Sequence, residues 1–190
     1  DWKLSGNIAT HGIQIMPLLK LLSKEISASG NMESQATFSA RSRTAYNLLN
    51  NLNARTVFNI QHGTLYHIDL AKAAQNLGQK GTHQGDTRFN ALSGKLELDD
   101  NAYHFTDLRV TSGLLDGSGD VYVSADKKIS GNINISLRGS AGLLNAPMEV
   151  VGTLDDPVMR VKRSALAGAA IGTAVLGPGL GTTLGIKASE

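Results

Sequence analysis

The chain contains no cysteine, few prolines and few aromatic residues, and two of these shortages exclude classes of function. Without cysteine it forms no disulfide, thiolate zinc site or thiol nucleophile. Aromatic residues make up only 5% of the chain, which disfavours a stacking platform for single-stranded nucleic acid. The 18 basic and 16 acidic residues nearly balance, whereas a dedicated nucleic-acid-binding domain carries a strong basic excess. We therefore expect no nucleic-acid partner.

The 190 residues suffice for one domain or two small ones, and 41% of them are hydrophobic, enough to form a core. Glycine is abundant, with 21 residues against 4 prolines, which favours bends and bulges in strands over a proline-rich linker. The lack of cysteine also suits an oxidising compartment. The sequence begins at Asp1 without a cleavable signal pattern, so we interpret it as a segment of a longer protein.

Much of the chain alternates apolar and polar residues with the period of two that is typical of strands. The clearest case is 129–137, where apolar residues and glycine alternate with serine and asparagine. Short polar turns at 99–101 and 126–128 separate such segments, and strands joined by short turns pair antiparallel. Alternation or apolar runs predict further strands elsewhere, at 2–15, 26–40, 55–60, 148–154 and 158–161.

Three short helices are expected between the strands of the first half. Pro17 begins the first helix, and Thr44 and Asp69 are candidate N-caps of the other two. His62 and Gly63 are expected to end the strand that precedes the third helix. The predicted helices cover 17–22, 44–52 and 70–77. The predicted fold class is mainly β with a few short helices, arranged as a curled antiparallel meander that forms a groove.

The apolar faces of the strands have two interpretations, a filled core or a groove that accepts a guest molecule. Both need the same alternation, so the pattern alone leaves both open. Under the groove interpretation, the lining consists of the apolar positions of the four best-defined strands. These residues are Leu92, Leu96, Leu98, Leu108, Val110, Val121, Val123, Ile129, Ile133, Ile135 and Leu137.

A short motif of serine, glycine, a third residue and an apolar residue recurs within the strands. It occurs at 5–8, 29–32, 93–96, 118–121 and 130–133. In several copies the glycine shares a face with the apolar residue two positions later. Such glycines either allow the sheet to bend strongly or allow a ligand or another backbone to approach closely.

Residues 164–190 form an Ala/Gly-rich C-terminal segment that is distinct from the β region of 1–163. No charged residue occurs from 164 to 186, and basic residues flank this stretch, as is typical of an amphipathic or membrane-touching element. Gly177-Pro178-Gly179 disfavours a continuous spanning helix. We expect membrane contact through 164–186, and the alternative is a flexible tail that packs on the sheet.

The sequence contains no catalytic or metal-binding motif. Its five histidines show neither the HExxH pattern nor close metal-ligand spacing. The paired aspartates at 99–100 and 155–156 fall at predicted turns, where aspartate is common for backbone reasons. Neither a GxSxG elbow nor a phosphate-binding loop occurs. We therefore predict a protein that is not an enzyme and has no metal or cofactor.

Several segments, taken in order, resemble the C-terminal region of the AsmA family. Residues 58–70 are similar to the family's signature of strand, glycine, Ile-Asp-Leu and helix. Residues 92–98 and 105–110 look like its paired strands, and 117–121 resembles its glycine-rich return strand. Residues 151–157 resemble its closing GTL-x-x-P turn. The resemblance covers all but roughly the first quarter of the chain.

The resemblance implies a periplasmic domain of an inner-membrane-anchored protein in a Gram-negative bacterium. It implies an elongated, curled sheet with an apolar concave surface and a relation to bridge-like lipid transfer proteins. The expected function is binding and transfer of a phospholipid or another acyl-chain lipid, for outer-membrane lipid homeostasis. The alternative is a structural scaffold that influences outer-membrane protein assembly by adding a strand of an envelope protein partner to an exposed sheet edge.

Overall fold

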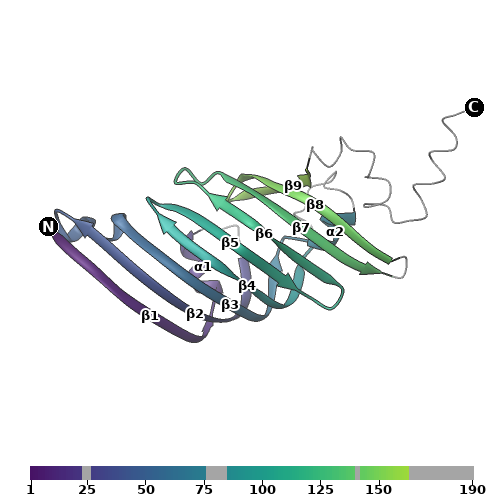
Figure 1. Cartoon of the computed structure of the whole chain (residues 1–190), viewed down its shortest axis with the longest axis horizontal. Helices are drawn as coiled ribbons and strands as arrows, with labels where there is room; N and C mark the ends of the chain where they lie inside the picture. The colour runs from purple at the N-terminus through teal and green to yellow at the C-terminus, as the bar shows by residue number, and fades with distance from the viewer. Residues whose placement is uncertain (23–26, 76–84, 140–141, 163–190) are drawn as a thin grey trace, which may run out of the picture.

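A computed structural model describes residues 1–22, 27–75, 85–139 and 142–162. They form one nine-stranded antiparallel sheet whose strands lie side by side in sequence order (Figure 1). The predicted mainly β class and the curled antiparallel meander are confirmed, and the sheet is unclosed. The elements are β1 (Trp2–Gln14), α1 (Met16–Leu22), β2 (Ser27–Ser42), η1 (Ala45–Asn47), η2 (Leu49–Asn51), β3 (Leu52–Tyr66), α2 (Leu70–Gln75), β4 (Thr87–Asp99), β5 (Ala102–Thr111), β6 (Leu115–Val123), β7 (Ile129–Gly139), β8 (Gly142–Thr153) and β9 (Asp156–Val161).

The connection between β4 and β5 shows how local sequence sets the strand pairing. Asp99 pairs with Ala102, so the loop contains only Asp100 and Asn101. Their φ angles are 45° and 61°, the left-handed values of a type I′ turn. Aspartate and asparagine tolerate this region better than most other residues do. The turn predicted at 99–101 is confirmed, and its twist matches that of the strands that it joins.

Both α-helices lie in connections at the same end of the sheet and on the same face (Figure 1). α1 begins beside Pro17 as predicted, and the Leu19 N–H donates to the carbonyl oxygen of Ile15 at 3.1 Å. In α2 the Asp69 carboxylate accepts the backbone N–H of Lys72 at 2.8 Å. Asp69 is therefore the N-cap that the sequence predicts.

The helix predicted over 44–52 is wrong. The segment forms two 3₁₀ turns, η1 and η2, and Thr44 makes no side-chain capping bond. Tyr46 and Leu49, which would lie on the apolar stripe of such a helix, are 91% and 71% exposed. A short helix gains most of its stability by packing an apolar face, and no surface formed by the described residues covers these side chains. Asparagine at several positions further disfavours a helix interior.

Strand β3 does not end at His62 and Gly63, contrary to the prediction, but continues to Tyr66. His62 and Gly63 together lie opposite Gly30 of β2, which makes this point a β-bulge. His62 has a φ of 51° and Gly30 a φ of 139°. The extra residue therefore kinks the strand without ending its pairing.

Similar irregularities in β1 and β5 bend the sheet elsewhere. The register of β1 with β2 shifts between Thr10 and Ile13, where Gly12 has a φ of 66°. The register of β5 shifts around Asp107, which has a φ of 54°. Each bulge bends its strand and increases the local twist, so together they help the sheet to curl. We call the face that carries α1 and α2 the inner face.

The buried core lies on the inner face and contains residues of β2 through β9. Ile135 of β7 and Met148 of β8 are 1% and 0% exposed, and α2 packs over these strands with Leu70 buried. Toward the other end, the inner face is open. Trp2 and Ile8 of β1 are 58% and 52% exposed. The inner face of β1 is therefore uncovered at these positions, although Ala28 of the neighbouring β2 is only 2% exposed.

Candidate functional site

The cross-strand register aligns apolar residues in rows across the inner face. Direct partners on one face have Cβ atoms about 4.5–5.5 Å apart, so they contact one another. In one row from β3 to β8, each residue is the direct partner of the next. This row consists of Ile60, Leu92, Val110, Gly117, Ile135 and Ala146, and none of its members is polar.

An apolar cavity of about 320 Å³ lies on the inner face, bounded on one side by Leu19 of α1. Its lining extends from β2 to β9, and Ser118 is the only polar residue among the described residues that line it. Neighbouring strands lie about 4.8 Å apart, so the sheet from β3 to β9 extends roughly 29 Å. Small-molecule pockets usually have volumes of about 300–1,000 Å³. We call this cavity and the inner-face side chains of β3–β9 around it the trough.

All residues predicted as groove lining lie on the inner face, on β4, β5, β6 and β7. The cavity itself is lined by Leu92, Leu108, Val110, Val121, Ile129, Ile133 and Ile135. The remaining predicted residues continue the same face outside the cavity lining: Leu96, Leu98, Val123 and Leu137. The structure therefore brings the predicted residues together on one surface.

Other lining residues were missed because they come from elements whose packing the sequence does not reveal. Leu19 belongs to a helix, and its contact with the sheet depends on tertiary structure. Phe58 lies in β3, where the alternation is visible in the sequence but the direction of the inner face is not. The missed apolar lining residues are Ile15, Leu19, Ala28, Phe58, Ile60, Leu65, Ile68, Leu70, Phe105, Val150, Pro157 and Met159.

Phe105 was missed because a bulge changes the phase of β5. In a regular strand, Phe105 would lie on the face opposite to Leu108 and Val110. The register of β4 with β5 leaves Asp107 and Leu108 together opposite Gly94. The extra residue returns Phe105 and Leu108 to the same face, and both line the cavity. A switch of phase in the apolar pattern at 105–108 is the sequence signal for this bulge.

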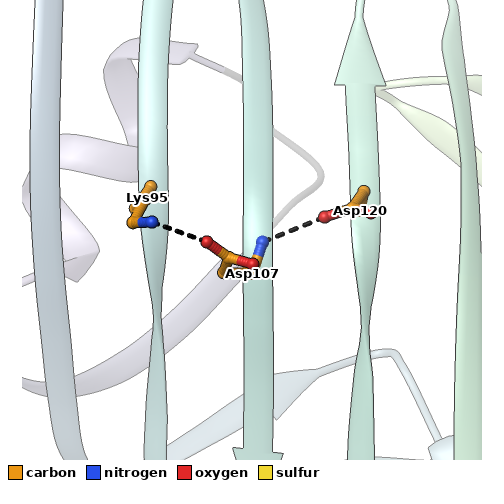
Figure 2. Close-up of polar contacts among 3 residues, drawn as sticks. All are labelled: Lys95, Asp107 and Asp120. Carbon is orange, nitrogen blue, oxygen red and sulfur yellow. Dashed lines mark hydrogen bonds and ion pairs between the residues drawn. The ribbon is translucent and has the colours of Figure 1, made fainter.

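Charged side chains on the outer face hold this bulge in place (Figure 2). The Lys95 ammonium donates to the Asp107 carboxylate at 2.7 Å, and the Asp107 backbone N–H donates to the Asp120 carboxylate at 2.9 Å. Lys95 therefore holds the pKa of the Asp107 carboxyl below its ordinary value, and Asp107 raises the pKa of Lys95. Exposed ion pairs stabilise a fold only weakly, so the main effect of these bonds is on the backbone geometry of the bulge.

Neighbouring groups occupy the space beside the glycines of the Ser-Gly motif. A Cβ atom on Gly94 would lie 2.8 Å from Cδ2 of Leu108 and 3.1 Å from Cζ of Phe58. A Cβ atom on Gly131 would lie 2.5 Å from the backbone oxygen of Asp120. Close approach of another backbone therefore explains Gly131, and close approach of side chains explains Gly94. These two glycines leave no room for a guest.

A second depression, of about 740 Å³, extends across β1–β5 and has a different character. Most of the residues that line it are polar or charged, and they include Arg55 and Glu97, which form an exposed ion pair at 2.8 Å. Such a solvated lining does not enclose a hydrocarbon chain. The trough is therefore the better candidate for a binding site.

Residues 1–22, 27–75, 85–139 and 142–162 contain no group of three or more histidine or acidic side chains able to hold a metal ion. His62 and His67 are both exposed, and their φ angles are positive. None of the helices within these residues is long and apolar enough to cross a membrane. The C-terminal segment 164–190, with the membrane contact expected through 164–186, lies outside the described residues.

The fold and the trough define an open, single-sheet β protein with one strongly apolar face. No family model, curated protein or solved structure matches the chain. The resemblance of its segments to the AsmA family stays a prediction. The function is therefore inferred from the geometry of the trough together with that resemblance.

Proposed function

We propose that the chain binds an acyl chain of a phospholipid or a similar lipid in the trough and takes part in lipid transfer in the cell envelope. The main support is the cavity lining, whose described residues include no polar one other than Ser118. A polar guest would lose its hydrogen bonds to water there without replacement, whereas a hydrocarbon chain would not. The AsmA resemblance adds a periplasmic location to this proposal, and the role is non-enzymatic.

Burial of hydrocarbon supplies enough free energy for this role. Each methylene removed from water contributes about 0.8 kcal/mol, so a long acyl chain contributes on the order of 10 kcal/mol. This contribution does not depend on direction, because it scales with the apolar area that is removed from water. A bound chain can therefore shift along the trough without breaking specific bonds. Strong burial combined with weak positioning suits a carrier that must release its lipid.

The lipid head group is expected to remain in solvent beyond the trough. Within the part of the chain that the structure describes, no charged side chain that would pair with a phosphate lines the cavity. A phosphate taken into the cavity would therefore be desolvated and unpaired, which is costly. We expect affinity to depend on the length of the acyl chain much more than on the chemistry of the head group.

Part of the inner face is already buried by contacts within the protein, and the proposed binding surface excludes this part. Ile135 and Met148 are almost fully buried, and they belong to the core under α2. Leu92, Val121 and Ile133 also line the cavity, but they retain partial exposure. The proposed contact with lipid is therefore made by the partly exposed side chains of β4, β6 and β7.

Replacement of Ile133 by Asp tests the proposal. The new carboxylate would stand in the cavity lining and would be desolvated by a bound acyl chain. We expect Ile133→Asp to weaken binding of a fluorescent fatty acid roughly tenfold or more, since this factor corresponds to only about 1.4 kcal/mol. The matched control is Asn134→Asp, because Asn134 is the next residue of β7 and lies on the outer face. The control is expected to bind as the parent does.

Circular dichroism shows whether each variant is folded, and native mass spectrometry of the gently purified parent shows whether it retains lipid. A folded Ile133→Asp variant that binds the fatty acid as well as the parent would contradict the assignment of this strand. A parent that retains no lipid and binds no fatty acid would contradict the proposal as a whole.

A second candidate function, a scaffold for the assembly of envelope proteins, is favoured by the edge of the sheet. Within the described residues, β1 has a neighbouring strand on one side only. An extended segment of another protein can add to such an edge through main-chain hydrogen bonds. Purification of the chain with a stoichiometric envelope protein and without lipid would favour this function over lipid transfer.

A further inference from the structure

The bulge in β5 affects both faces of the sheet. Of the described residues of β5, Asp107 alone has a direct partner in neither β4 nor β6. Its φ of 54° lies in the left-handed region, which most residues other than glycine avoid. Such a conformation persists only where the surrounding structure holds it, and bulges of this kind often lie next to functional sites. The residues that hold Asp107 in place are therefore candidates for a functional role.

Asp120 of β6 supports the bulge through a bond to its backbone. The Asp107 N–H donates to the Asp120 carboxylate at 2.9 Å, and this carboxylate replaces the ladder partner that the bulge removes (Figure 2). A hydrogen bond to a charged acceptor is stronger than one between neutral groups. On the other side, the Lys95 ammonium donates to the Asp107 carboxylate, in an exposed pair. Asp120 is the stronger support of the two, because it binds the backbone itself whereas Lys95 binds a side chain.

The residue opposite the bulge is adapted to it on the inner face. Asp107 and Leu108 together lie opposite Gly94 of β4. A Cβ atom on Gly94 would lie 2.8 Å from Cδ2 of Leu108, so a larger residue at this position would require Leu108 to move. Glycine at this position therefore leaves the space that the bulged strand needs for Leu108, which lines the cavity.

Loss of the bulge would change which side chains of β5 face the trough. In an unbulged strand, Phe105 and Leu108 would lie on opposite faces, because they are an odd number of residues apart. Val110 is 8% exposed in the core, which fixes the half of β5 after the bulge. The half before the bulge would reverse, and His104 and Thr106 would replace Phe105 on the inner face. A bound acyl chain would then desolvate an imidazole and a hydroxyl group, which costs free energy.

We propose that Asp120 is a positioning residue for the lipid site, on which it acts from the opposite face of the sheet. By supporting the bulge, its carboxylate keeps Phe105 and Leu108 together on the inner face. The same contact keeps His104 and Thr106 on the outer face, where they are the direct partners of Glu97 and Lys95. The trough therefore stays apolar because of a polar contact that the lipid does not touch. This role rests on the proposed lipid binding.

Asp120→Ala removes the acceptor of the Asp107 N–H and tests the proposal. We expect this variant to bind a fluorescent fatty acid about fivefold more weakly than the parent, at the lower end of the usual coupling between separate sites. Asp120→Asn keeps an oxygen acceptor without the charge, so we expect a smaller loss, about twofold. The matched control is Asp116→Ala. Asp116 lies on the same face of β6, and its carboxylate is 3.5 Å from the Arg138 guanidinium. The control is expected to bind as the parent does.

The contact between the rings of His104 and Tyr122 shows which face the first half of β5 presents, without any lipid. The two rings meet edge to face on the outer face, with their centroids 4.4 Å apart. The parent and Asp116→Ala are expected to show a nuclear Overhauser effect between the rings. Asp120→Ala is expected to weaken this effect, since reversal of the strand removes His104 from the outer face. Circular dichroism shows whether each variant is folded, and Asp120→Asn supports the same two measurements if Asp120→Ala fails to fold.

Two results would each overturn the inference. The first is a folded Asp120→Ala variant that binds the fatty acid as tightly as Asp116→Ala does. The second is a loss of affinity that leaves the Overhauser effect between His104 and Tyr122 as strong as in the parent, because Asp120 would then not act through the bulge. A parent that binds no fatty acid would contradict the proposed function, and this outcome is distinguishable because it is seen before any substitution is made.

Discussion

At the scale of single residues, glycine is required where a side chain would collide with the neighbouring strand. A Cβ atom on Gly131 of β7 would lie 2.5 Å from the Asp120 oxygen and 3.0 Å from Cα of Val121. Both contacts are with backbone, so relief requires movement of β6. We expect Gly131→Ala to lower the free energy of unfolding by about 1–3 kcal/mol, as overpacking does.

Gly139 offers a control for this substitution in the same strand. A Cβ atom on Gly139 would meet no atom of the described residues within 4 Å. Gly139→Ala is therefore expected to change the free energy of unfolding by no more than about 0.5 kcal/mol, as is usual for an exposed position. Urea unfolding of both variants provides the measurement. If both variants lost the same free energy of unfolding, close approach of the β6 backbone would not be the cause of the loss in Gly131→Ala.

Two exposed carboxyl groups are expected to titrate at unusually low pH. Lys95 lowers the pKa of Asp107, and hydrogen bonds from Lys128 and Ser124 lower the pKa of Asp126 to about 2. A carboxyl group in an unfolded chain titrates near 3.9. Because the folded pKa values are the lower ones, their stabilisation is present above that pH and is lost as the pH falls toward 2.

NMR titration of the carboxyl carbons measures the pKa values of Asp107 and Asp126 in one experiment. Lys95→Met is expected to return the pKa of Asp107 toward its ordinary value. The same variant leaves the pKa of Asp126 at about 2, because Lys128 and Ser124 hold that carboxylate independently. An Asp107 carboxyl that titrates identically in the parent and in the variant would contradict the role assigned to Lys95.

At the scale of an element, α2 is fastened to the sheet by a buried hydroxyl group. Oγ1 of Thr87 accepts the Leu70 N–H at 2.9 Å and donates to the Ile68 carbonyl at 2.7 Å. Thr87→Val keeps the shape of the side chain but leaves two backbone groups unpaired. We expect a loss of about 1–3 kcal/mol in the free energy of unfolding, measured with urea.

A second threonine separates this effect from the general cost of the substitution. Thr111 at the end of β5 is exposed, so Thr111→Val is expected to be nearly neutral. If the Thr87→Val variant were as stable as the parent, packing alone would hold α2 in place.

The sequence predicts some elements better than others. Elements that depend on neighbouring residues are predicted well, whereas those that depend on tertiary packing are not. The turn at 99–101 and the Asp69 cap depend on neighbouring residues, and both were predicted. The segment 44–52 carries a helical pattern, but its apolar side chains find no partner surface. β8 begins at Gly142, earlier than the predicted start at residue 148, because pairing with β7 extends it.

At the scale of the whole molecule, alternation predicts which residues share a face but not how that face is used. A filled core and an open trough require the same pattern, and the structure combines them along one sheet. Ile135 is buried in the core under α2, whereas Ile133, two residues earlier, is partly exposed. Leu19 lines the cavity because of where α1 packs, and Phe105 lies on the inner face because of the bulge in β5. Neither placement follows from simple periodicity.

Because the strands lie in sequence order, each one forms its ladder only with the strands before and after it. Addition or removal of one hairpin would change the length of the sheet by about 9.6 Å and would not require any other strand to find a new neighbour. Repeat proteins gain and lose units for the same reason. The architecture therefore lets evolution adjust the span of an apolar surface in steps of two strands.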